Sequence, residues 1–139
     1  MKTKDHEITF SHEKVQEFVQ LTGDRNPIYQ SIDKAKEYGF KTIPLPPAMP
    51  NIAYQWIEIP WNLQDPVIHR KQKCVLHQRM FIEERYRAVI KVTDQYERHH
   101  HFFIQQTLYL YDGNGLLCFE GISDLVAGGY HERTHLSNN

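Results

Sequence analysis

The sequence lacks the features that mark a membrane or secreted protein. It contains no apolar run of about 18 residues, so no transmembrane helix is expected. Residues 1–10, MKTKDHEITF, include basic side chains but no apolar core, which argues against a secretory signal. Only 2 cysteines occur in 139 residues, too few for a disulfide framework. We therefore expect Cys74 and Cys118 to be free thiols of a cytoplasmic protein, and a disulfide between them is the less favoured alternative.

The sequence also lacks an excess of either charge. Lys and Arg together number 16 and Asp and Glu 17, which gives a formal net charge of −1. Proteins that bind nucleic acid or anionic membranes through their field need a basic excess, so neither partner is expected. What is present, 40% hydrophobic and 24% charged residues, is typical of a globular protein. We expect one domain over residues 1–129, followed by a polar tail over residues 130–139.

One apolar stretch, residues 44–57, organises the rest of the chain. Its apolar side chains recur at i, i+3, i+4 and i+7, which predicts one helix face formed by Met49, Ile52, Ala53 and Trp56. Its prolines at positions 46, 47 and 50 fit only before or within the first helical turn. The sequence therefore predicts a long apolar central helix that other elements must cover on most sides.

Short helices are predicted before this stretch. Ser11 is suited to cap a helix that ends at Gly23, because glycine is the usual residue past a helix end. Asp24–Pro27 has the composition of a turn in which both the Asp and the Asn can bond nearby backbone. Either Ser31 or Asp33 then caps a second short helix.

The second half of the chain changes to a period of two. Alternating rows run through residues 74–81, 86–93 and 102–110, and Asp-Gly-Asn-Gly at 112–115 predicts a hairpin turn. Residues 60–73 show no clear period and are predicted to form a long connection. Helices followed by consecutive antiparallel strands indicate the α+β class, with the strands wrapped around the central helix.

Three segments resemble a known family. Residues 23–29 read Gly-Asp-Arg-Asn-Pro-Ile-Tyr, and residues 46–49 read Pro-Pro-Ala-Met after a capped helix. Together with residues 77–81, which look like the family's second strand, they resemble the MaoC-like branch of the hot-dog superfamily. That branch includes the R-specific enoyl-CoA hydratases and the (3R)-hydroxyacyl-thioester dehydratases. The resemblance covers residues 10–126 and implies an antiparallel sheet curled around one long apolar helix.

The resemblance implies catalytic roles for Asp24 and Tyr29. Active members carry Asp-x-Asn-Pro-x-His, in which the Asp and the His hold the water that adds to the double bond. Asp24 matches the Asp and Asn26 positions it, but Tyr29 stands in place of the His. A tyrosine hydroxyl has an ordinary pKa of about 10, so at neutral pH it donates a hydrogen bond and hardly accepts a proton. This departure resembles the N-terminal MaoC-like dehydratase domain, in which one hot-dog is often degenerate and pairs with a competent one.

The start of the central helix is the expected binding site for the thioester carbonyl. Pro47, Ala48 and Met49 lie there, and free N–H groups at a helix N-terminus attract anions. Ala48 stands where many hydratases have a glycine, yet it keeps its N–H. Two plainer alternatives stay open: the prolines only shape a buried helix entrance, and Asp24 only bonds the backbone of its turn.

The resemblance implies a substrate and a partner chain. The substrate is an acyl-CoA or acyl-carrier-protein thioester, and no cofactor or metal is needed. The partner is an identical chain or another hot-dog chain, joined through exposed strand edges that also favour pairing on physical grounds. Residues 70–73, Arg-Lys-Gln-Lys, can meet a carrier phosphate, although a solvated loop is the favoured alternative.

Three other functions are weighed against a hydratase. A non-catalytic subunit or acyl-thioester binding module is favoured by Tyr29. A thioesterase would need a carboxylate on the central helix, where only Glu58 occurs, at its far end. A metal site at residues 99–101, three of the 9 histidines, is less favoured than a solvated strand end, because consecutive strand residues point to opposite faces.

Overall fold

The chain runs from a short strand through small helices into four long strands. A computed structural model describes residues 1–132, with side chains up to Tyr130. The elements are β1 (His6–Thr9), α1 (His12–Thr22), η1 (Pro27–Tyr29), α2 (Ile32–Glu37), η2 (Met49–Trp56), β2 (Trp61–Leu76), β3 (Arg85–Arg98), β4 (His101–Tyr111) and β5 (Leu117–Glu132).

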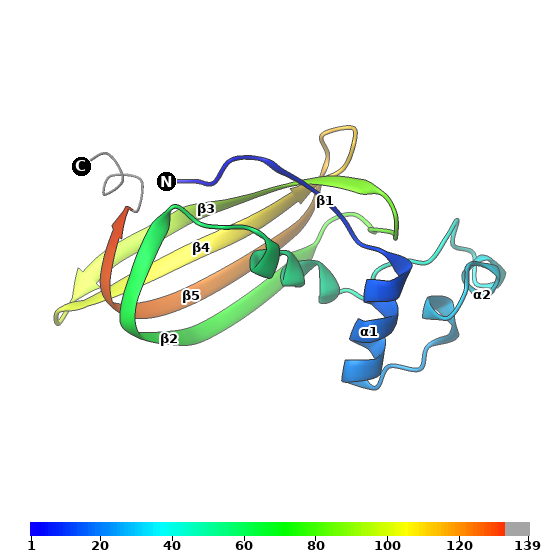
Figure 1. The fold of residues 1–139 in the computed structure, drawn as a ribbon, viewed down its shortest axis with the longest axis horizontal. Helices are drawn as coiled ribbons and strands as arrows, with labels where there is room; N and C mark the ends of the chain where they lie inside the picture. Colours follow the sequence, from blue (N-terminus) through cyan, green and yellow to red (C-terminus); the bar gives the residue numbers. More distant parts are fainter. Residues whose placement is uncertain (133–139) are drawn as a thin grey trace.

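Within residues 1–132, the five strands form one antiparallel sheet in the order β1-β3-β4-β5-β2. Figure 1 shows η2 lying against the curled sheet, while α1 and α2 lie together beyond one end of it. Small helices followed by consecutive antiparallel strands confirm the predicted α+β class. None of the helices in the described part of the chain is long and apolar enough to cross a membrane.

The apolar rows predicted on β3 and β4 face one another in the core. Tyr86, Ala88 and Ile90 are buried on β3, and Ala88 pairs with Leu110 while Ile90 pairs with Leu108. All five side chains belong to one apolar cluster that includes residues of η2 and of the segments around α1. The period of two therefore identified these strands and their buried faces correctly.

The hairpin turn between β4 and β5 is also confirmed. The Asp112 N–H donates to the Leu116 carbonyl at 2.9 Å, and Asp112 Oδ1 accepts from the Asn114 N–H at 2.9 Å. Gly115 has a φ of +81°, a conformation that glycine adopts without steric cost.

β2 corrects two predictions. Residues 60–73 are not a long connection, because β2 begins at Trp61 and pairs with β5 to its end at Leu76. The predicted strand through residues 77–81 is also wrong, because β2 ends at Leu76 and these residues belong to the connection to β3. β2 is an edge strand, and its side chains from Gln64 to Cys74 are exposed on both faces. Without a buried face, the strand leaves no alternation in the sequence.

The predicted long α-helix over residues 44–57 is wrong in both type and length. η2 is a 3-10 helix of 8 residues. Its entry is closed by bonds of the i to i+3 type, from the Met49 N–H to Pro46 O at 3.0 Å and from the Asn51 N–H to Ala48 O at 3.3 Å. Pro50 has no N–H to donate, and Pro60 disfavours helical backbone at the residue before it. Prolines therefore limit the helix at both ends.

The tighter helix changes which side chains it buries. Met49 and Ala53 are buried as predicted, but Trp56 is 36% exposed. A 3-10 helix has about 3.0 residues per turn, so a face chosen at the α-helical spacing of about 3.6 drifts toward solvent. The Trp56 ring instead lies 5.3 Å from the Phe10 ring, between centroids, at the margin of the core.

Polar contacts fix η2 to the sheet. The Tyr54 hydroxyl lies 2.6 Å from the Gly121 carbonyl oxygen and 3.1 Å from that of Gln106. The Asn51 side chain lies so close to Gly121 that a Cβ at that position would overlap Asn51 Oδ1. A larger residue at this position of β5 would therefore require the Asn51 side chain to move.

The caps of α1 and α2 agree with the sequence. The Ser11 hydroxyl accepts from the N–H three residues later at 3.1 Å, and Gly23 ends α1 with a φ of +74°. Ser31, rather than Asp33, caps α2, accepting at 3.0 Å.

The end of the domain and the two thiols can be compared with the predictions in part. β5 continues to Glu132, past the expected domain boundary at residue 129. The rest of the predicted tail, residues 133–139, lies outside the described residues. Cys74 is exposed and Cys118 is buried, and both are free, as expected.

Candidate functional site

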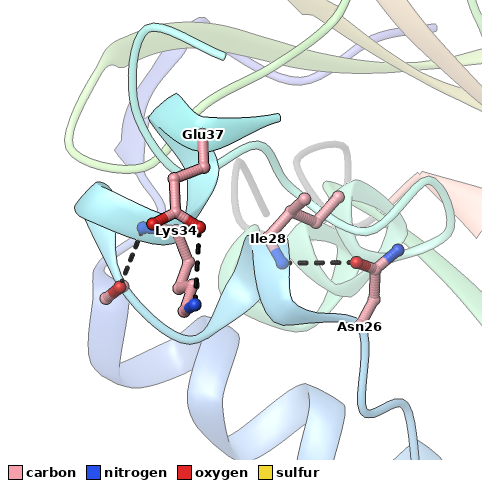
Figure 2. A network of polar contacts seen from close by, with 5 residues as sticks. Asn26, Ile28, Lys34 and Glu37 are labelled. Atoms are coloured by element: carbon pink, nitrogen blue, oxygen red, sulfur yellow. Dashed lines mark hydrogen bonds and ion pairs between the residues drawn. The ribbon is translucent and has the colours of Figure 1, made fainter. Parts of the chain in front are cut away.

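The turn after α1 is built by two side chains that bond nearby backbone. Asp24 Oδ1 accepts from the Asn26 N–H at 2.9 Å, and Asn26 Oδ1 accepts from the Ile28 N–H at 3.2 Å. Figure 2 shows the second bond, which caps η1, beside the Lys34–Glu37 ion pair of α2. Pro27 occupies the first position of η1, where no N–H is needed. The Asp-x-Asn-Pro element thus folds into a defined turn.

Asp24 lies at the surface of the single chain. Its side chain is exposed, and its backbone N–H donates to Val19 O at 3.0 Å at the end of α1. Its own contacts are those of a turn residue, the plainer of the two roles considered for it. The single chain thus does not give Asp24 the partial burial expected of a catalytic base.

Tyr29 is buried close to Asp24. It is 6% exposed, and its carbonyl oxygen accepts a hydrogen bond from Gln16 Nε2. Burial raises the pKa of the Tyr29 hydroxyl, the Asp24 charge raises it further, and the Arg79 charge opposes the rise. The hydroxyl therefore stays protonated at neutral pH, where it can donate a hydrogen bond but hardly accept a proton.

Arg79 is a residue that the sequence did not single out as part of the site. It lies in the connection between β2 and β3, and its guanidinium carbon is 4.7 Å from the centroid of the Phe40 ring. Its charge reaches the Tyr29 hydroxyl from a segment 50 residues away in the chain. No local motif marks this arginine, because its place depends on how the connection folds back toward Phe40.

The entrance of η2 offers one free donor. Pro47 and Ala48 are exposed, whereas Met49 is buried and its N–H already donates to Pro46 O at 3.0 Å. Within the described chain, the Ala48 N–H has no hydrogen-bond partner. Among the three residues predicted to bind the thioester carbonyl, Ala48 is thus the one with an available N–H. No hydrogen bond joins this entrance to Asp24 or Tyr29 in residues 1–132.

The histidines do not form a metal centre in the described part of the chain, where no three His, Cys, Asp or Glu side chains gather. His99 and His100 have positive φ values of 53° and 65° and form the turn between β3 and β4, at the opposite end of the sheet from α1 (Figure 1). His77 instead pairs with Glu120, with Nε2 and Oε2 2.6 Å apart.

A family model described as "FAS1-like, dehydratase domain region" matches residues 1–126 of the sequence. A search of curated proteins finds no match to the chain.

Solved structures with the same fold include a dehydratase complex and a hydratase. The HadBC (3R-hydroxyacyl-ACP dehydratase) complex of Mycobacterium tuberculosis is similar, with a TM-score of 0.78 and 15% identity over 91% of this chain and 95% of that one. The (R)-hydratase of A. caviae involved in PHA biosynthesis gives a TM-score of 0.73 and 17% identity over 90% and 92% of the two chains. The ChsH1–ChsH2 complex of M. tuberculosis gives 0.71 and 17% over 91% and 83%. These similarities confirm the hot-dog fold.

Proposed function

The chain belongs to the FAS1-like dehydratase-region family of hot-dog proteins, and from this premise we propose that it serves the reversible hydration of trans-2-enoyl thioesters to (3R)-hydroxyacyl thioesters. The resemblance to MaoC-like dehydratases and R-hydratases is confirmed at the level of family and fold. The substrate class is supported by two neighbours, described as a 3R-hydroxyacyl-ACP dehydratase and an (R)-hydratase. We place the reaction in cytoplasmic fatty-acid metabolism.

One observation carries the proposal: the hydrogen-bonded turn at Asp24 and Asn26 leads directly into the buried Tyr29. Asp24 and Tyr29 are the two positions that match the family's water-holding pair. In the hydration direction, Asp24 takes a proton from water while the oxygen adds to the β-carbon, and the protonated Asp24 carboxyl then delivers that proton to the α-carbon. Asn26 holds Asp24, and Tyr29 donates a hydrogen bond to the water.

The thioester carbonyl would accept from the Ala48 N–H at the entrance of η2. Charge that develops on that oxygen is stabilised by a donor already in place, an effect often worth several kcal/mol in acyl chemistry. Pro47 and Met49 shape the same entrance. The N–H needs no particular side chain, so alanine at this position retains the donor.

We further propose that the site is completed by a second hot-dog chain, identical or not. β2 leaves one edge of the sheet unpaired, and 16 residues of strand are a long edge to leave exposed. Two of the similar structures, HadBC and ChsH1–ChsH2, are themselves complexes of different chains.

A second candidate function, a binding subunit that pairs with a competent hot-dog, is favoured by the environment of Tyr29. Its pKa is raised by burial, so the hydroxyl cannot act as the base that a histidine provides. Loss of one positioned acid–base group costs about 10² to 10⁴ in rate. A thioesterase is not favoured, because the segment Met49–Trp56 contains no carboxylate.

Hydration of crotonyl-CoA by the purified protein tests the first candidate. We expect measurable turnover that Asp24→Asn abolishes and Asp33→Asn, on exposed α2, leaves within twofold. Tyr29→His should raise the rate by about 10²-fold, since it restores a group that can exchange protons at neutral pH. Equal rates for the native protein and Asp24→Asn would contradict the proposed catalytic role.

The same assay separates the two candidates. A chain that is inactive alone, but supports turnover when mixed with a hot-dog protein carrying an intact Asp and His, is the binding subunit. In that case Asp24→Asn leaves the rate of the mixture unchanged.

A further inference from the structure

A cavity is lined by Arg79, the residue whose charge acts on the Tyr29 hydroxyl. It has a volume of about 410 Å³ and is open to solvent. Its walls come from the β2–β3 connection, the start of β3, the β4–β5 turn and the residue after Phe40. The side chains that matter for binding are Lys41, Arg79, Phe81, Glu84, Arg85 and Tyr86.

Three cationic side chains line this cavity, and they differ in whether a carboxylate of the chain pairs with them. They are Lys41, Arg79 and Arg85. Lys41 Nζ lies 2.7 Å from Glu84, and Arg85 lies 3.4 Å from Glu7, but both pairs are exposed and such pairs contribute little. Arg79 has no carboxylate partner among the described residues. Its stack on an aromatic ring holds the guanidinium in place while its N–H donors stay available.

The two carboxylates of the cavity are already bonded from within the chain. Asp112 Oδ1 accepts from the N–H groups of Asn114 at 2.9 Å and Leu116 at 3.0 Å. Glu84 accepts from Lys41, and from the Tyr86 hydroxyl at 3.3 Å. An anion entering the cavity therefore meets an unpaired guanidinium, and both nearby carboxylates have internal donors.

The remaining walls are mixed, because Gln78 and Asn114 are polar while Phe81 and Tyr86 are aromatic. Phe81 and Tyr86 line the cavity, and Lys41 Nζ lies 4.5 Å from the Phe81 ring centroid. A volume of about 410 Å³ falls within the range of small-molecule sites, roughly 300 to 1,000 Å³. The cavity thus suits a slender ligand with an anionic group at one point and apolar or amide portions elsewhere.

Arg79 connects this cavity to the candidate site. We propose that the cavity binds the phosphate-bearing arm of the thioester carrier, with Arg79 as the main phosphate ligand and Lys41 beside it. This inference rests on the proposed function, and it deepens it by assigning the carrier end of the substrate to a definite place. A guanidinium can bind a phosphate through two parallel N–H···O bonds, which lysine cannot do. The basic residues 70–73, considered earlier for this role, lie on the exposed edge strand β2 instead.

Calorimetric titration with unacylated ligands tests the assignment without any turnover. The probes are coenzyme A, pantetheine 4′-phosphate and pantetheine, the last of which lacks the phosphate. We expect Arg79→Gln to weaken binding of both phosphorylated probes at least tenfold, and Arg79→Lys to lie between this variant and the native protein. Arg98→Gln is the matched control, because it removes the same charge at the far hairpin, and it should stay within twofold.

Two results would overturn the assignment: equal affinity of the native protein and Arg79→Gln, or equal affinity for pantetheine and its phosphate. If coenzyme A binds more tightly than pantetheine 4′-phosphate, the cavity assignment is supported and the carrier is the nucleotide-bearing coenzyme A. If coenzyme A and pantetheine 4′-phosphate bind equally well, the cavity assignment is supported and the carrier is the prosthetic arm of a carrier protein. Thermal unfolding of each variant checks that the exposed Arg79 is not needed for folding.

The test is independent of the proposed reaction. If crotonyl-CoA is not hydrated but binding depends on Arg79, the cavity assignment stands and the proposed chemistry fails. If hydration occurs while Arg79→Gln changes neither KM nor ligand affinity, the chemistry stands and the cavity assignment fails.

Discussion

At the scale of single residues, Tyr54 shows how a hydroxyl can hold a helix to a sheet. Its oxygen lies 2.6 Å from the Gly121 carbonyl and 3.1 Å from the Gln106 carbonyl, which belong to neighbouring strands. Both carbonyls face η2, so the hydroxyl satisfies polar groups that the helix would otherwise shield from water.

We expect Tyr54→Phe to lower the free energy of unfolding by about 1 kcal/mol, the typical net value of one buried hydrogen bond. Urea denaturation followed by fluorescence measures the change. Tyr38→Phe is the matched control, because Tyr38 is 61% exposed and should change stability by less than about 0.5 kcal/mol. An equal effect of the two variants would show that the Tyr54 hydroxyl contributes nothing.

Site residues were predictable from the sequence only where a local motif encodes them. The Asp24–Pro27 turn has its own hydrogen-bond pattern, so its shape followed from residue type and spacing. The exposure of Asp24 did not follow, since it depends on what packs against the turn. Arg79 was missed because it reaches Tyr29 only through the long-range fold of the β2–β3 connection.

At the scale of elements, the crossing of η2 over β5 depends on one glycine. A side chain at Gly121 would overlap Asn51 Oδ1 and lie 3.1 Å from the Phe119 ring. Asn51 also accepts a hydrogen bond from Gln72 Nε2 of β2 at 3.2 Å. The helix, β5 and β2 therefore meet at this position.

We expect Gly121→Ala to destabilise the protein by about 1 to 2 kcal/mol, because Asn51 must move and its bond to β2 is lost. Adding Asn51→Ala should make the double variant more stable than the sum of the single changes, by at least about 0.5 kcal/mol. Denaturation of all four proteins of the cycle measures the coupling. Gly113→Ala is the control, since a Cβ there meets nothing within 4 Å. Strict additivity would mean that the side chain of Asn51 is not the obstacle.

Elements were predicted well where burial leaves a period. β3 and β4 have one covered face, and the alternation at residues 86–93 and 102–110 located both strands, which extend beyond these rows. β2 has no covered face between Gln64 and Cys74, so periodicity had nothing to detect. For η2 the apolar content was recognised but the pitch was not, because prolines before, within and after it favour the tighter 3-10 turn.

At the scale of the whole molecule, buried phenols and a buried thiol set an alkaline limit to stability. Burial raises the pKa values of Tyr54 and Tyr86 above the ordinary 10.0, and raises that of the Cys118 thiol from 9.0 to about 11. The folded state thus holds these protons more tightly than the unfolded state does.

The sign of the effect follows from proton linkage. Above about pH 9 the unfolded chain binds fewer protons than the folded chain, so stability falls as the pH rises from 9 through 11, and the full contribution is present below pH 9. We expect the urea midpoint to be lower at pH 10.5 than at pH 8. The double variant Tyr54→Phe, Tyr86→Phe should show a shallower decline. A midpoint that stays constant from pH 8 to 10.5 would contradict this.

The long open border of the sheet also limits how copies can assemble. β2 contains Pro66, carries Lys71 and Lys73, and breaks register with β5 at two places. Such features hinder the flat, endless stacking that leads from soluble chains to fibres. An edge strand of this kind can pair with one matched strand of a second chain, but it is a poor template for the addition of further chains. Concentrated solutions of the protein should therefore end in closed pairs rather than in growing filaments.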